Sequence, residues 1–189
     1  MSPILIAPPA VEPVSLADAK LYLRIDGPDE DELLRALITA SRLLIEAASG
    51  RLMIAQTWRL VLGAWPAGGA LRLPFAPVAS IAAARTFDAV GTATPVPAGV
   101  LSLMPNTDPA VLRLDASPPE PGRRQSGIEI DLVCGFGPAA ADVPAPLRQA
   151  MLRLVARWFE NRGDDAQGTE ARLPADVMAL IAPYRRARL

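Results

Sequence analysis

The residues that most often carry acid–base and nucleophilic chemistry are scarce in this chain. Its 189 residues include no histidine and a single cysteine, Cys134. Histidine is the commonest general base and metal ligand, so its absence removes the usual catalytic and zinc-binding sets. A lone cysteine cannot form an intrachain disulfide. Because Cys134 follows an apolar strand pattern, we predict a buried thiol rather than a reactive one.

Carboxylates are the remaining candidates for chemistry, and they gather in the segment IDGPDEDE at residues 25–32. This run lacks the glycine position and the ligand spacing of a calcium-binding loop. Acidic side chains are favourable near a helix N-terminus, so the pattern predicts a solvated turn before a helix.

Enzyme activity is not expected from this sequence. The chain has no glycine-rich phosphate loop, and nothing in it places two carboxylates around a common reactive centre. We therefore predict no catalytic residues, no bound cofactor and no metal site.

The charge of the chain is nearly balanced, with 19 basic and 20 acidic residues and a formal net charge of −1. Of the basic residues only Lys20 is a lysine, and the other 18 are arginines. A balanced charge argues against a general nucleic-acid binder driven by phosphate neutralisation. The planar fork of arginine suits protein interfaces better than the point charge of lysine, although a GC-rich genome explains the same bias.

The elements that must position these residues begin with the clearest helix of the chain, which is predicted over residues 142–163. Its main apolar stripe recurs at helical spacing and consists of Leu147, Met151, Leu154, Val155 and Trp158. A second apolar line beside it consists of Leu152, Ala156 and Phe159. So wide an apolar face needs cover on more than one side. We therefore expect the second line to pack on the N-terminal helices or on an adjacent subunit.

Three further helices are predicted from start and stop signals. Ser15 with Asp18 resembles a capping box and opens a short helix that Gly27 ends. Asp29 with Glu32 opens a longer helix that carries Leu33, Leu37, Leu44 and Ile45 and runs to Gly50. A short helix with apolar anchors follows at residues 174–182.

Strand patterns occupy the middle of the chain. From residue 56 onward the apolar period changes to two, and short runs are separated by Pro, Gly, Asn and Asp. Ile128, Ile130 and Leu132 alternate with Glu129 and Asp131, which predicts one buried and one wet face. The fold class expected is α+β, with N-terminal helices, a small antiparallel β-sheet or partly closed barrel, and C-terminal helices with an extended tail.

The ends of the chain differ in composition from its centre. Residues 1–13 are proline-rich and predict an extended arm. Residues 163–189 combine a polar, glycine-bearing linker, a short helix and the basic ending YRRARL. We therefore expect an α+β domain over residues 14–162, flanked by the arm and by this C-terminal segment.

A set of segments in a fixed order resembles the head–tail connector, or adaptor, family of long-tailed phages and gene transfer agents. The resemblance starts with EPVSLADAKLYLRIDGPDEDELLRALITASRLLIEAASGR and continues with QTWRL and LPFAPVASI. It resumes with IEIDLVCGFG and DVPAPLRQAMLRLVARWFENR, and closes with LPADVMALIAPYRR. These segments cover nearly the whole chain. Cys134 is a departure, since the family often has a small or hydroxyl residue there.

The resemblance implies a structural role in a virion. Members form a dodecameric ring beneath the portal protein, extend the channel for double-stranded DNA without reading its sequence, and present a surface to a stopper or tail-completion protein. The expected location is the head–tail neck of a phage or gene transfer agent particle, after synthesis in the bacterial cytoplasm. No membrane partner is expected, because no apolar run is long enough to span a bilayer.

The resemblance also suggests roles for named residues. Family adaptors insert C-terminal segments into the portal, and tyrosine and arginine are favoured interface anchors. Portal docking is therefore predicted for Tyr184, Arg185, Arg186, Arg188 and Leu189. Subunit packing is predicted for Leu152, Ala156 and Phe159. Two alternatives remain open at this point: a stopper or tail-completion protein of the neck, and a nucleic-acid-binding module.

Overall fold

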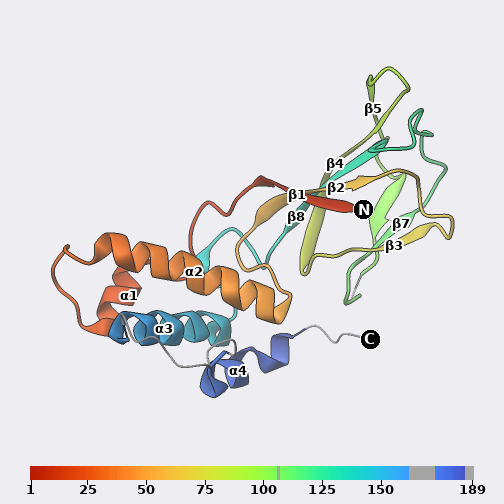
Figure 1. Cartoon of the computed structure of the whole chain (residues 1–189). Coiled ribbons are helices and arrows are strands. Elements are labelled where there is room, and N and C mark those ends of the chain that lie inside the picture. Colours follow the sequence, from red (N-terminus) through yellow and green to blue (C-terminus); the bar gives the residue numbers. More distant parts are fainter. Residues whose placement is uncertain (106, 162–172, 186–189) are drawn as a thin grey trace. The chain divides into compact units, whose positions relative to one another are not determined.

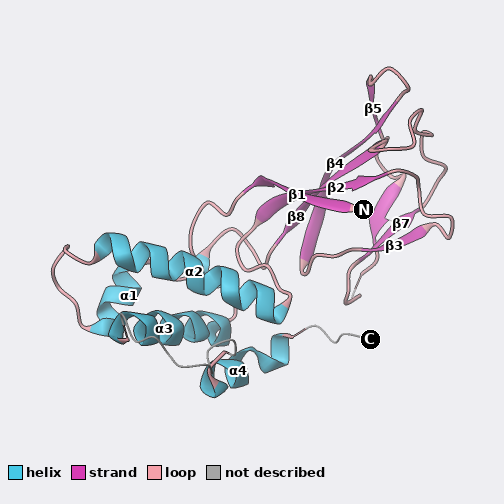
Figure 2. Ribbon diagram, viewed as in Figure 1, coloured by secondary structure: helices cyan, strands magenta, loops and turns pink. Residues whose placement is uncertain are grey.

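The computed structural model describes residues 1–105, 107–161 and 173–185 of the chain. Within them the chain forms two compact units, one built from strands and one from helices (Figures 1 and 2). The strand unit contains Met1–Ala10 and Ala55–Phe136. The helical unit contains Val11–Ile54 and the described residues from Gly137 onward. This division cuts across the expected arm of residues 1–13, whose first part belongs to the strand unit.

A five-stranded antiparallel sheet forms the centre of the strand unit, in the order β1-β2-β8-β4-β5. Its strands are β1 (Ser2–Ala7), β2 (Gln56–Leu62), β8 (Ile128–Cys134), β4 (Val78–Phe87) and β5 (Ala93–Pro95). A second, three-stranded antiparallel sheet has the order β3-β7-β6. Its strands are β3 (Ala70–Arg72), β7 (Val111–Leu114) and β6 (Leu101–Leu103).

The alternation along β8 determines which face of the large sheet is buried. Ile128, Ile130 and Leu132 are fully buried, and Leu60 of β2 lies opposite Ile130 in the register. The core face is completed by apolar side chains from the loops and from the small sheet, among them Leu73, Phe75, Val100 and Leu112. The alternation of apolar and polar side chains along β8 is therefore confirmed, but the polar face is not wet, since Glu129 is half-buried and Asp131 is buried.

Strand β1 was expected only as an extended arm. In the structure Ser2–Ala7 pairs with β2 along the edge of the large sheet. The run ILIA is short, and the prolines on either side obscure its period in the sequence. Pro3 is tolerated because β1 is an edge strand, where one row of backbone groups has no ladder partner.

The helical unit follows the order of the predicted helices. Its α-helices are α1 (Leu16–Leu23), α2 (Asp31–Ser49), α3 (Ala145–Glu160) and α4 (Ala175–Ile181), with short 3₁₀ turns at η1 (Ala140–Asp142) and η2 (Ala182–Tyr184). The capping box before α1 is confirmed, since Ser15 Oγ accepts from the Asp18 backbone N–H and Asp18 accepts from the Ser15 backbone N–H. The predicted cap at Asp29 is wrong. Helix α2 begins two residues later, with Glu30 at its N-cap position and no side-chain cap hydrogen bond. Asp31 in its first turn pairs with the Lys20 ammonium at 2.7 Å.

Helix α3 is the central element of the helical unit and packs against α1, α2 and α4. Its main stripe is confirmed as core, with Leu147, Met151, Leu154 and Val155 all buried. Trp158 is only half-buried. The segment 142–144 precedes the helix rather than belonging to it, and Pro146 occupies the first turn, where a missing N–H costs little.

The described part of the chain confirms the α+β class. Of the two sheet architectures expected, the structure shows open antiparallel sheets, whose linear strand orders leave free edges. None of the described helices combines the length and the apolar character needed to cross a lipid bilayer.

Candidate functional site

The second apolar line of α3 lies partly at the surface. Leu152, Ala156 and Phe159 are each half-buried, unlike the fully buried main stripe. Ala156 lines an open cleft of about 360 Å³, whose walls come from α1, α3 and α4 and include Tyr22 and Asp176. Each of the three residues thus keeps surface that another molecule can cover. Their role in subunit packing stays a prediction.

The C-terminal segment is anchored to the helical unit up to Tyr184. Val177 and Ile181 of α4 are buried, and Asp176 forms an ion pair with Arg153 of α3 at 2.7 Å. The Arg51 Nε donates to the Tyr184 carbonyl oxygen at 2.9 Å. Arg185 then follows as an exposed residue.

The remaining docking residues predicted from the sequence, Arg186, Arg188 and Leu189, lie outside the described part of the chain. The structure therefore places Tyr184 and Arg185 together at the end of an anchored helix. Portal docking by the five residues stays a prediction.

The polar face of the large sheet carries a network of four charged residues. Arg59 of β2 contacts Asp131 of β8 at 2.7 Å and Glu129 at 3.1 Å. Arg85 of β4 contacts the same two carboxylates, at 2.7 and 2.9 Å. The hydrogen bond from Arg59 lowers the pKa of Asp131, and the charges of both guanidinium groups lower it further. The two guanidinium groups and the two carboxylates balance in charge, so the network itself presents no net charge to a ligand.

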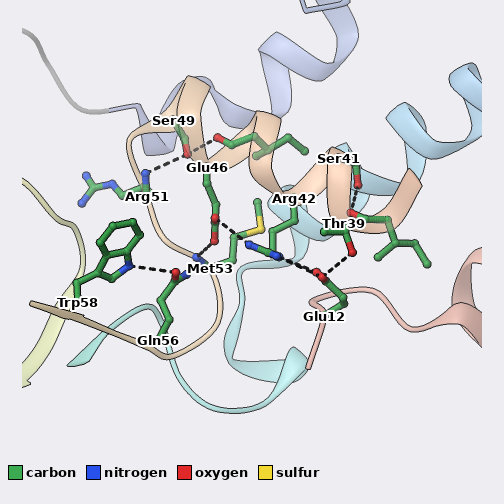
Figure 3. A network of polar contacts seen from close by, with 12 residues as sticks. Glu12, Thr39, Ser41, Arg42, Glu46, Ser49, Arg51, Met53, Gln56 and Trp58 are labelled. Atoms are coloured by element: carbon green, nitrogen blue, oxygen red, sulfur yellow. Dashed lines mark hydrogen bonds and ion pairs between the residues drawn. The ribbon is translucent and has the colours of Figure 1, made fainter. Parts of the chain in front are cut away.

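A second ionic network lies on the inner side of α2 (Figure 3). The Glu12 carboxylate accepts from Arg42 Nε at 2.7 Å and from Thr39 Oγ1 at 3.0 Å. The Glu46 carboxylate accepts from Arg42 Nη1 at 3.1 Å and from the Met53 backbone N–H at 2.8 Å. Arg42 and Glu46 are both buried, although a helix of this apolar pattern is expected to expose its charges.

The burial of Arg42 and Glu46 has a counterpart on the other side of α2. Leu44, which the sequence pattern assigns to the helix interior together with Leu33 and Leu37, is exposed, and so is Leu43. Leu33 and Leu37 are only half-buried, whereas Ile45 is fully buried. The start and stop signals that set the bounds of this helix did not indicate which of its leucines face outward.

The acidic run at residues 25–32 is paired with two cations, Lys20 and Arg35, and Arg35 contacts Glu32 at 2.6 Å. The Lys20 Nζ donates to Asp31 and to the Gly27 carbonyl oxygen, both at 2.7 Å. Among the described residues, no three acidic, cysteine or histidine side chains gather closely enough to hold a metal ion. The run behaves as the solvated helix-leading turn that its composition predicts.

Cys134 and Arg123 both make contacts inside the strand unit. Cys134 is fully buried, and burial raises the pKa of its thiol to about 12, so the predicted inert thiol is confirmed. Arg123, in the loop after β7, lies over the Phe87 ring at 4.5 Å and donates to the Ser126 carbonyl oxygen. The two groups serve packing.

Among the solved structures that resemble this chain, three come from gene transfer agent particles. One belongs to the neck of an empty particle computed with C6 symmetry, at 31% identity and a TM-score of 0.84. The others belong to the virion of the native particle, at 33% and 0.78, and to the native neck computed with C12 symmetry, at 33% and 0.75. Each match covers 100% of this chain and 97% of the other. No protein-family model and no curated protein matches the chain.

Proposed function

We propose a function from one premise: the chain belongs to the head–tail connector, or adaptor, family of tailed phages and gene transfer agents. The proposed role is that of a structural adaptor in the neck of such a particle. There the chain forms a ring beneath the portal protein, extends the DNA channel and joins the head to the tail. The observation that carries this role is the likeness to neck chains over the full length of both partners.

The ring is supported by the symmetry of the similar particles. Their necks were computed with C6 and with C12 symmetry, and a ring of twelve subunits is compatible with both. A closed ring raises the overall affinity above that of any single contact, because each subunit contacts its neighbours and the next ring at the same time. A small adaptor then needs neither a cofactor nor a deep binding pocket.

The surfaces of the described residues are consistent with assembly. The charges in the polar networks are largely paired with one another, whereas apolar side chains are exposed on α2 and on β1. The anchored end of α4 presents Tyr184 and Arg185, and we assign portal docking to the segment that begins there. A stopper or tail-completion role, one position further along the neck, is the second candidate, and it predicts binding to an adaptor ring instead of the portal.

Portal binding by purified full-length chain tests this role. We expect the chain to be retained on immobilised portal rings, and deletion of residues 183–189 to weaken retention at least about tenfold, as for loss of interface anchors. The double variant Arg185→Ala/Arg186→Ala should act in the same direction. Its matched control is Arg72→Ala/Arg124→Ala, which removes two exposed arginines from the strand unit.

The outcomes separate the two candidates. Retention that is unchanged by the deletion would show that the C-terminal segment does not dock. Retention of the wild-type chain on an adaptor ring from a related particle, without binding to the portal, would favour the stopper role.

A further inference from the structure

Helix α2 has apolar residues on two opposite sides. One side faces the helical unit and buries Leu34, Ile38 and Ile45. The other side is exposed and consists of Ala36, Ala40, Leu43, Leu44 and Ala47. Their spacing of four, three, one and three residues places them along one line of an α-helix. We call this line the outer stripe.

The outer stripe presents apolar surface to the solvent, because its two leucines are well exposed. Leu43 keeps 54% of its surface accessible and Leu44 keeps 39%. Single exposed apolar residues are common, whereas a continuous apolar line on one element indicates an interaction surface.

No exposed charge interrupts the outer stripe from residue 36 to residue 50. The two charged residues in that span, Arg42 and Glu46, are buried on the inner side. Along α2 itself, the exposed charges nearest in sequence to the stripe belong to Glu32 and Arg35, which pair with each other at 2.6 Å. The stripe therefore offers nothing to a phosphate group or to a polar ligand, and its occupant must itself be apolar.

The rotation of α2 that exposes these leucines is fixed by the ionic network of Figure 3. Glu12 and the Met53 backbone N–H hold Arg42 and Glu46 inward through bonds of 2.7 and 2.8 Å. Rolling the helix to bury Leu43 and Leu44 would break these bonds and leave buried charges unpaired, which is costly. The fold thus maintains the exposure of the outer stripe.

We propose that the outer stripe is the seat of a second copy of this chain in the neck ring. The inference rests on the ring of the proposed function. In a closed ring each subunit contacts two neighbours through two different surfaces. Alanines at three of the five positions allow another element to approach α2 closely, and the two leucines supply the protruding side chains that interdigitate.

The size of the stripe favours a ring over a free dimer. A helix of 19 residues is about 28 Å long at 1.5 Å per residue. One face of such a helix provides less than the roughly 800 Å² per partner that a stable, specific pair buries. The contact is therefore weak by itself and becomes effective when ring closure adds the contacts together.

The test introduces charge into the outer stripe. Leu43→Glu and Leu44→Glu are compared with Val90→Glu, which makes the same kind of change at a residue that is 88% exposed in the turn between β4 and β5. Ring formation by the full chain is measured by native mass spectrometry, alone and on portal rings. We expect both leucine variants to weaken association at least about tenfold and the control to assemble like wild type. A cooperative thermal unfolding transition, measured for each variant, checks that the variant is folded.

A second readout does not depend on disrupting assembly. Leu43→Cys adds one accessible thiol to a chain whose own Cys134 is buried. We expect alkylation of the new thiol to slow at least about tenfold in the ring relative to the monomer, since interface burial excludes the reagent. Val90→Cys is the matched control and should react at the same rate in both states.

The outcomes show whether the inference fails alone or together with the proposed function. Normal rings from Leu43→Glu, with unprotected thiol in Leu43→Cys, overturn the inference and leave the proposed function intact. A wild-type chain that stays monomeric on portal rings overturns both. Protection that requires a different neck protein in place of a second copy also overturns the inference.

Discussion

Charge is neutralised residue by residue on the polar face of the large sheet. Arg59 and Arg85 come from strands on either side of β8, and each contacts both Glu129 and Asp131. Because β8 lies between the two arginine-bearing strands, its carboxylates are the shared centre of the network. Opposite charges that face each other across strands stabilise the pairing register.

The lowered pKa of Asp131 predicts a specific dependence of stability on pH. The folded-state pKa lies below the unfolded value, so this stabilisation is present above about pH 3.8 and is lost as pH falls through the folded-state pKa. We expect Asp131→Asn to lower the free energy of unfolding by about 1–3 kcal/mol at pH 7. The difference from wild type should shrink on acidification below pH 4.

Urea unfolding at a series of pH values measures this difference. Asp26→Asn, at an exposed position of the acidic run, serves as the control and should change stability little. An Asp131→Asn deficit that persists unchanged at low pH would contradict the assigned ion pairs.

At the scale of the element, α3 separates stability from assembly. Met151 belongs to the buried stripe that holds the helical unit together, whereas the neighbouring Leu152 is half-buried. Two residues adjacent in sequence point to different sides of a helix, so their substitution should affect different properties.

Truncation of these two side chains tests that separation. Met151→Ala should lower the free energy of unfolding by about 2–5 kcal/mol, because it opens a cavity in the core. Leu152→Ala should cost clearly less in the monomer but should reduce ring yield, if the second apolar line packs between subunits. Denaturant titration and native mass spectrometry give the two readouts. Equal ring yield from Leu152→Ala and wild type would count against the packing role of Leu152, Ala156 and Phe159.

At the scale of the whole molecule, the balance of charge argues against tight binding to DNA. The net charge is −1, and many of the arginines that the structure describes are paired with carboxylates. Phosphate neutralisation by several free cations is what makes DNA binding tight and salt-dependent. Weak binding suits a protein that lines a DNA channel, because the DNA must pass along the wall without being held there.

Fluorescence anisotropy with a labelled duplex checks this expectation. We predict weak binding at physiological salt and a shallow dependence of the binding constant on salt concentration. A variant without residues 183–189, which removes the three arginines of the tail, should show an even shallower dependence. Tight binding with a steep salt slope would favour a nucleic-acid-binding module over the adaptor role.

The sequence by itself determined the elements whose cause is local. The capping box at Ser15 and Asp18, the buried stripe of α3 and the alternation along β8 all follow from neighbouring residues, and each is present in the structure. The α+β class follows from the order of these elements. The full-length likeness to neck chains agrees with the ordered segments on which the resemblance rests.

Only the tertiary structure decided which side of each element faces out. Helix α2 exposes Leu43 and Leu44 because Glu12, 30 residues before Arg42, holds that arginine inward. Likewise, the arginine partners of Asp131 lie 72 and 46 residues away along the chain, so only strand register brings them together. Local periodicity predicts which residues of a helix or strand share a face. Charge pairing between residues far apart in the sequence determines how that element is rotated about its axis, and so which face is left exposed for assembly.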